Sequence, residues 1–234
     1  MPPAGVNAEN RGVERDTYRL GGWAGIAVGI AYVVITGLYV VGGQMPGSVD
    51  GAAWLTYVGE RTAVAWGIIG LSVITDMLYL PIAAAVVVAL GPSRRVPSLV
   101  GATLLALFVV IDLATTWASY GSLMRLADAE PTAAVVAAAT YAAATFHSSL
   151  FAVYVILVPS IGVFILSALM LQEFSRAAGW TGIATGIVGA VAVLGGFVAP
   201  ALGTLAIPAS ILTAAWVVIV GYRLLRLAGS VQAR

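Results

Sequence analysis

The sequence predicts an all-α membrane protein with six transmembrane helices and both termini in the cytoplasm. Hydrophobic residues make up 61% of the 234 residues and charged residues only 9%, which leaves too little polar surface to cover a water-soluble domain. Apolar runs of about twenty residues, each long enough to cross the roughly 30 Å of membrane hydrocarbon as a helix, recur along the chain. The arginines gather in alternate connecting segments, which fixes the expected orientation.

The expected spans form one membrane domain with a short polar segment at each end. We place the spans at residues 21–41, 62–90, 97–120, 146–171, 179–198 and 205–225. Residues 1–18 form a polar cytoplasmic segment, residues 19–226 the six-helix domain and residues 227–234 a short cytoplasmic tail. The first twenty residues lack the apolar core and cleavage site of a signal peptide, so we expect the first helix to stay in the mature protein.

The distribution of arginine predicts the orientation of the bundle. Six spans bring both termini to one side, and of the arginines only Arg61 and Arg125 fall on the other side. Positively charged loops stay in the cytoplasm. We therefore expect the plasma membrane of a bacterium, with these segments in the cytoplasm: the termini, GPSRRVPS and QEFSRAAG.

Two longer loops are expected on the external side. One, GQMPGSVDGAAWLTYVGER, carries Trp54 and Tyr57 in an amphipathic context that suits the outer membrane interface. The other ends in an Ala-rich segment that is expected to be helical from Pro131. An unbroken helix from there to Leu171 would be about 60 Å long and would exceed the bilayer. It must therefore protrude, tilt or bend, and Pro159 is the expected bend.

The residue inventory excludes several kinds of chemistry. The chain has no Cys, which removes disulfides, thiolate metal sites and cysteine nucleophiles. It has no Lys, which removes a retinal Schiff base and a catalytic amine. His147 is the only histidine, so paired-histidine haem and multi-histidine zinc sites are excluded. With a net charge of +1 and no basic run, no nucleic-acid partner is expected. We expect no metal and no cofactor.

A short motif occurs twice, as GWAGIAVGI in the first span and as GWTGIATGI in the fifth. An acidic residue and an arginine precede each copy, which puts both tryptophans at headgroup depth. Gly25 and Gly29 in one copy, and Gly182 and Gly186 in the other, form small-xxx-small faces that let helices approach closely. Inverted halves of a transporter would match the first helix with the fourth. We therefore interpret the motif as an anchoring and packing device.

Four segments resemble a bacterial membrane family catalogued as domain of unknown function 4386. They are RLGGW at the first span, TDMLYLPIAAAVVVAL in the second, FHSSLFAVYVILVPSIGVFIL in the fourth and FSRAAGW at the fifth. The resemblance covers residues 19–225. It implies a six-helix membrane fold with a feature in the regions of Asp76 and His147, and it implies no activity.

Two carboxyl groups are expected at the same depth in the bilayer. Asp76 lies fifteen residues before Gly91 (91 minus 76), and Asp112 lies fifteen residues beyond Pro97 (112 minus 97). Each is therefore about 22 Å from the cytoplasmic end of its helix. Carboxylates at this depth usually face the bundle interior or a water-filled cavity, and they mark candidate functional sites. No arginine is expected nearby, so we expect at least one Asp to carry its proton at neutral pH.

The expected site is an outward-facing polar cleft around the two aspartates. Helical spacing supplies polar neighbours on the second and third spans, and Thr140, His147 and Tyr154 share a face of the fourth. The candidate ligand-binding residues are Ser72, Asp76, Tyr79, Asp112, Thr115, Thr116, Ser119, His147 and Tyr154. Alternatively, these groups only hydrogen-bond between helices and hold the bundle together. Three prolines are more easily explained as kinks than as ligand contacts: Pro81, Pro159 and Pro208.

Three classes of function stay open. The favoured class binds or transports a small cationic or lipophilic ligand at the aspartate pair, from the outer side. The second is a membrane enzyme acting on a lipid or isoprenoid, with Asp76, Asp112 and His147 as its acid and base groups. The third is an accessory or scaffold subunit that docks a partner subunit or a second copy through Gly25 or Gly182.

Overall fold

The computed structural model describes residues 4–147 and 152–232, and over these residues every regular element is a helix. Six helical stretches are long and apolar enough to cross a membrane, which confirms the predicted fold class. They are Arg11–Gly42, Thr62–Ala89, Pro92–Ala127, Val153–Glu173, Arg176–Gly196 and Pro200–Val231. Which end of the bundle lies in the cytoplasm stays a prediction.

The spans are assembled from α-helices and two π-helical turns. The elements that cross are α1 (Ala4–Gly42), α3 (Thr62–Ala89), α4 (Arg95–Asp112) with the π turn η2 (Leu113–Trp117) and α5 (Ala118–Ala127), the π turn η3 (Val153–Leu157) with α8 (Val158–Glu173), α9 (Arg176–Gly196) and α10 (Ala206–Gln232). Shorter helices connect them: α2 (Gly51–Glu60), η1 (Pro92–Arg94), α6 (Ala133–His147) and η4 (Pro200–Leu205).

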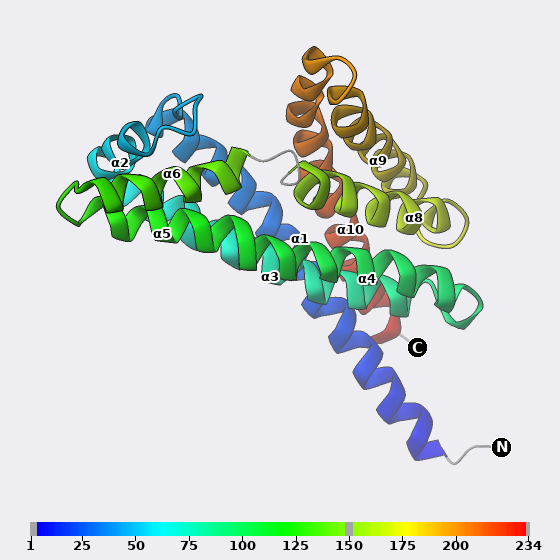
Figure 1. The fold of residues 1–234 in the computed structure, drawn as a ribbon. Helices are drawn as coiled ribbons and strands as arrows, with labels where there is room; N and C mark the ends of the chain where they lie inside the picture. The colour runs from blue at the N-terminus through cyan, green and yellow to red at the C-terminus, as the bar shows by residue number, and fades with distance from the viewer. Residues whose placement is uncertain (1–3, 148–151, 233–234) are drawn as a thin grey trace.

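The spans pack as a closed ring in chain order (Figure 1). α1 packs on α3, α3 on α4, α4 on α8, α8 on α9 and α9 on α10, and α10 returns to α1. Because the number of spans is even, the first and last helices run in opposite directions, and both termini lie at one end, at the lower right of Figure 1. The ring leaves an interior to which all six spans contribute.

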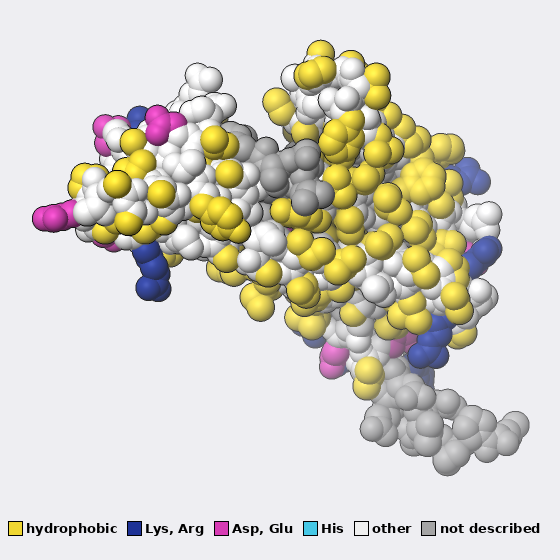
Figure 2. Space-filling view, viewed as in Figure 1, with side chains coloured by type: hydrophobic (Ala, Val, Ile, Leu, Met, Phe, Trp, Pro, Cys, Tyr) yellow, Lys and Arg dark blue, Asp and Glu magenta, His cyan; other side chains and the backbone are white. Residues whose placement is uncertain are grey.

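Polar contacts between loops join the arginine-rich end of the ring. Arg94 Nε donates to Glu173 Oε1 over 3.1 Å, and Arg94 also donates to the Gln172 side chain over 2.8 Å. Arg223 Nε donates to the carbonyl oxygen of Phe174 over 3.0 Å. Figure 2 shows dark-blue arginine side chains along the right and lower-right edge, beside a broad yellow hydrophobic face. The loops that share an arginine excess therefore do meet at one end.

The doubled motif turns its tryptophans outward in both copies. Trp23 is 61% exposed and Trp180 is 64% exposed, which suits residues that contact lipid. In the first copy the glycine face packs inside the ring. A Cβ atom on Gly25 would lie 2.7 Å from the carbonyl oxygen of Val217 and 2.9 Å from Cα of Gly221, both on α10. α1 therefore approaches α10 backbone to backbone.

The second copy packs its glycines against the preceding helix. A Cβ atom on Gly186 would lie 2.8 Å from the carbonyl oxygen of Ser160 on α8, and one on Gly182 would overlap the Ser167 hydroxyl. Both glycine faces are thus occupied within the chain. The feature that suggested docking of a partner or a second copy is explained by packing inside the ring.

A second apolar core lies near the arginine-poor end, where α2, α5 and α6 pack together and form what we call the cap. Trp54 is fully buried at its centre, with ring centroids 6.0 Å from Tyr57, 6.4 Å from Tyr120 and 5.8 Å from Phe146. Both side chains are therefore buried against the protein, because α5 and α6 supply an apolar surface that covers them. Whether this segment lies along the membrane interface stays a prediction.

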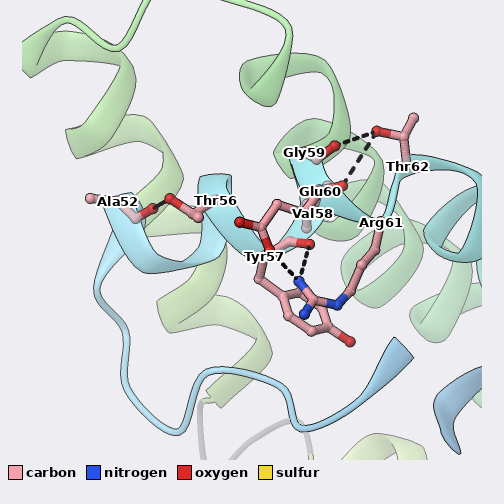
Figure 3. Close-up of polar contacts among 8 residues, drawn as sticks. All are labelled: Ala52, Thr56, Tyr57, Val58, Gly59, Glu60, Arg61 and Thr62. Atoms are coloured by element: carbon pink, nitrogen blue, oxygen red, sulfur yellow. Dashed lines mark hydrogen bonds and ion pairs between the residues drawn. The ribbon is translucent and has the colours of Figure 1, made fainter. Parts of the chain in front are cut away.

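Local hydrogen bonds set both ends of α2. Asp50 Oδ1 accepts from the Ala52 N–H over 3.0 Å and caps the first turn. At the other end Arg61 turns the chain into α3 (Figure 3). Its guanidinium donates to Glu60 Oε2 over 2.9 Å and lies 4.9 Å from the ring centroid of Tyr57. The corner between α2 and α3 is thus held by Arg61 together with Thr62, whose hydroxyl donates to the Gly59 carbonyl over 3.0 Å.

The described residues before and after positions 148–151 pack on different helices. α6 packs on α2 and α5, whereas α8 packs on α4 and α9, and residues 148–151 lie outside the described residues. Among the described residues the fourth span is Val153–Glu173. The distortion expected at Pro159 takes the form of the π turn just before it. Proline has no N–H, and its ring collides with the carbonyl four residues back, which favours an interruption of the regular helix there.

Candidate ligand site

The ring of spans surrounds a cavity of about 270 Å³ to which every span contributes lining residues. Sites for drug-sized ligands usually have volumes of roughly 300–1,000 Å³, so this cavity suits a small molecule. Its wall combines aromatic and aliphatic side chains with a few polar groups. This composition is typical of a small-molecule site, where a few polar groups fix the orientation of an otherwise apolar ligand.

The two predicted carboxyl groups meet in this cavity. Asp76 on α3 and Asp112 at the end of α4 both line it and are only 4% and 3% exposed. Their helices are neighbours in the ring, and the carboxyl groups lie close enough to interact directly. Asp76 lies fourteen residues after Thr62 and thirteen before Ala89, which is about 20 Å from either end of its helix. Both carboxyls are therefore deep in the bundle.

The two carboxyl groups have different hydrogen-bond partners. The Trp117 indole N–H donates to Asp76 Oδ2 over 2.7 Å, a short bond typical of a charged or strongly polarised acceptor. Asp112 Oδ1 and the Thr116 hydroxyl are equally buried, and neither makes a hydrogen bond of good geometry with a described residue, although the Thr116 and Trp117 side chains lie within reach of the Asp112 carboxyl. Asp76 is thus fixed by the protein, whereas Asp112 keeps an acceptor oxygen that is not used.

Aromatic rings form the wall beside the carboxyls. The hydroxyl oxygens of Tyr32 and Tyr79 lie 3.1 Å apart in a hydrogen bond, and the Tyr79 ring meets Phe108 edge to face at 5.9 Å. All three residues line the cavity, as does Trp117. None of the described lining residues is an arginine, and the chain has no lysine. The aspartates are therefore not neutralised by a basic side chain within the described wall.

The π turn after Asp112 decides which polar residues reach the cavity. A π turn contains one residue more than a turn of α-helix. The residues after Asp112 that face the cavity are therefore shifted by about one position along the sequence. Thr116 and Trp117 consequently line the cavity. Thr115 instead donates to the Ile111 carbonyl over 2.7 Å. The second π turn, η3, also borders the cavity, through Val155 and Ile156.

The structure brings most, but not all, of the predicted site residues together. Five line the cavity: Ser72, Asp76, Tyr79, Asp112 and Thr116. Thr115, Ser119 and Tyr154 are not among its lining residues, because the two π turns rotate the faces on which they were placed. The side chain of His147 lies outside the described residues. Whether the five bind a ligand stays a prediction.

Sequence reasoning missed several lining residues. Trp117 could not be assigned without knowledge of the π turn, since a regular helix points it away from the Asp112 face. Tyr32 and Tyr39 lie seven residues apart on α1, a two-turn spacing that was a usable signal. Thr185 and Thr213 are isolated polar residues on α9 and α10, and nothing in the sequence separates them from hydroxyls that only bond to their own helix.

The cavity is displaced toward the arginine-poor end of the ring. Tyr39 lines it only three residues before α1 ends at Gly42, and Ala209 lines it three residues after α10 begins. At the other end no described lining residue comes closer than Thr185, which lies nine residues, or about 13 Å, after Arg176. The packed core of the ring closes the arginine-rich side.

The described residues contain no group of three His, Cys, Asp or Glu side chains that could hold a metal ion. The carboxyl oxygens and hydroxyls can accept hydrogen bonds, and aromatic faces attract cations. No family model, no curated protein and no solved structure matches this chain.

Proposed function

We propose that this protein binds or transports a small lipophilic cation in the cavity at the centre of its ring of helices. The supporting observation is that Asp76 and Asp112 line the cavity beside Tyr32, Tyr79 and Phe108, with no arginine among the described lining residues. Buried carboxylates are costly unless paired. A bound cation would supply the missing positive charge, and the aromatic faces would add to its attraction.

The location of the cavity supports access from the outer side. Its lining residues lie toward the arginine-poor end, and the opposite end carries the arginines Arg94, Arg176 and Arg223. By the positive-inside rule the arginine-rich end is cytoplasmic, so the cavity is nearer to the outer surface of a bacterial plasma membrane. Membership of the family known as domain of unknown function 4386 is part of this proposal and rests on the segments quoted above.

The test is native mass spectrometry of the gently detergent-solubilised protein. We expect a small cation to accompany the wild type and to be lost in Asp76→Asn and Asp112→Asn. Asp128→Asn is the control, because Asp128 is exposed and does not line the cavity. A mass spectrum and a thermal stability that are the same in all four proteins would show that the aspartates form no binding site.

A further inference from the structure

We propose that the ligand ends in an ammonium group that carries N–H bonds, and that Asp112 and Thr116 hold this group. The inference rests on the proposed function and narrows its ligand from any lipophilic cation to a protonated amine. It assigns different roles to the two aspartates: Asp112 contacts the ligand, and Asp76 is a neighbour whose position Trp117 fixes.

The first step of the argument is the hydrogen-bond inventory of the cavity. Asp76 Oδ2 already accepts the Trp117 indole N–H over 2.7 Å. Asp112 Oδ1 and Thr116 Oγ1 are each in residues only 3% exposed, and neither makes a hydrogen bond of good geometry with a described residue, although the Thr116 side chain lies within reach of the Asp112 carboxyl. Buried polar atoms in native proteins almost always have a partner. The two oxygens therefore mark a place where a bound ligand could donate hydrogen bonds.

The second step is the geometry of the two oxygens. Asp112 and Thr116 are four residues apart, so their side chains share one helix face, and both line the cavity. A primary ammonium presents three N–H donors, enough for both oxygens at once. A quaternary ammonium has the same charge but no donor, and it would leave both oxygens unsatisfied. The arrangement therefore discriminates by N–H bonds and not only by charge.

The third step concerns the remainder of the ligand. Beyond the carboxyls the wall combines aromatic and aliphatic side chains, such as Phe108, Val155 and Ile156, with scattered hydroxyl groups. A volume of about 270 Å³ suits a compact hydrocarbon body. The ligand class is therefore a small amine with one aromatic or aliphatic group.

The experiment compares amines with their N-trimethyl counterparts on the full-length detergent-solubilised protein. The probes are hexylamine, phenethylamine and adamantylamine, each paired with its trimethylammonium form, and phenethyl alcohol is the neutral control. Dissociation constants come from concentration-dependent shifts in melting temperature. We expect at least one amine to bind ten-fold or more tightly than its trimethyl form, and phenethyl alcohol to bind more weakly than phenethylamine.

Two adjacent threonines provide a matched pair of variants. Thr116→Val removes an unpaired cavity hydroxyl, and we expect it to weaken amine binding while leaving trimethylammonium binding unchanged. Thr115→Val removes a hydroxyl that bonds to the Ile111 carbonyl outside the cavity wall, so amine binding should be retained. If both variants affect the amine equally, Thr116 has no direct contact with the ligand, and the inference is wrong.

The outcomes separate this inference from the proposed function. Equal affinity for amine and trimethylammonium forms, lost in Asp112→Asn, would overturn the N–H requirement and leave the cation site standing. No binding of any amine would also overturn the inference, and the native mass spectrum would then decide independently whether the cavity holds another cation. Binding of phenethyl alcohol as tightly as phenethylamine, unaffected by Asp112→Asn, would overturn both.

Discussion

The two halves of the ring are built from the same six spans but differ in their packing. Toward the arginine-rich end the interior is filled by residues that are at most 1% exposed, such as Val86, Leu90, Met170 and Leu224. Toward the other end the spans surround the cavity and its carboxyl groups. A protein closed on one side and hollow on the other suits access from a single side of the membrane.

Helix regularity accounts for much of this difference. In the closed half α1 and α10 are uninterrupted, and glycines such as Gly25 and Gly221 bring their backbones together. Both π turns of the described chain border the hollow half. π turns interrupt regular helical bonding and occur often at functional sites. They rotate side chains that a regular helix would place elsewhere, as Trp117 shows.

The largest effect is expected from added volume in the closed half. Gly25→Ala puts a methyl group 2.7 Å from the Val217 carbonyl and 2.9 Å from Cα of Gly221, backbone atoms that cannot rotate away. We expect the free energy of unfolding to fall by about 1–3 kcal/mol. Gly37→Ala on the same helix is the control, because its methyl group would have no neighbour within 4 Å. Equal stability of the two variants would show that the α1–α10 contact is not tight.

The next effect tests the bond that fixes Asp76 in the hollow half. Trp117→Phe removes the indole donor at 2.7 Å from Asp76 Oδ2 and keeps an aromatic ring. Single hydrogen bonds between membrane helices contribute about 0.6 kcal/mol on average and up to roughly 1.7 kcal/mol. Because this bond is short, we expect a loss near the upper value. The measurement is a double-mutant cycle with Asp76→Asn in unfolding experiments, and a coupling energy near zero would contradict the prediction.

The sequence predicted the spans well because their physical signal is strong. A long apolar run such as residues 62–90 is stable mainly as a membrane-spanning helix. The structure has a helix of suitable length and apolarity at Thr62–Ala89. The equal depth of Asp76 and Asp112 on adjacent helices was predicted, but the sequence left open whether the two carboxyl groups face each other, because it does not fix the rotation of each helix about its axis. Trp117 could not be predicted, because one extra residue in a turn changes which side chains face inward. The buried position of Trp54 depended on α5 and α6, which are distant in the chain.

A smaller effect is expected from the ion pair that joins two loops of the closed half. Arg94 and Glu173 are 39% and 34% exposed, so water screens their attraction. Pairs of this kind contribute about 0–1 kcal/mol. We expect Arg94→Gln to lower the free energy of unfolding by less than 1 kcal/mol, and we expect the loss to shrink in high salt. A salt-independent loss would assign the effect to the Gln172 hydrogen bond instead.

The smallest effect is expected in the cap beside the hollow half. It is a change in the pKa of Tyr57, which is measured by titration. Burial raises the pKa of the Tyr57 phenol, and the Arg61 guanidinium at 4.9 Å from its ring centroid lowers it in part. Arg61→Gln removes only the lowering influence, so the pKa of Tyr57 should rise further. Because the folded-state pKa exceeds the unfolded value of about 10, the stabilisation by neutral Tyr57 is complete below that pH and is lost as pH rises through the folded pKa.

The variant should therefore keep this stabilisation to a higher pH than the wild type. The measurement is an alkaline absorbance titration of tyrosinate, from which the titration of Tyr57→Phe is subtracted in each background. Arg125→Gln, which removes the other arginine of the arginine-poor end, is the control, because its charge is not among the influences on Tyr57. A fall in the pKa of Tyr57 in Arg61→Gln would mean that the cap loosens and water reaches the phenol. In that case the main role of Arg61 would be to hold α2 against α3 through its side-chain contacts, and not to lower the pKa of Tyr57. The packing of the cap would then depend on one arginine side chain, whereas the closed half is packed through glycine backbone contacts.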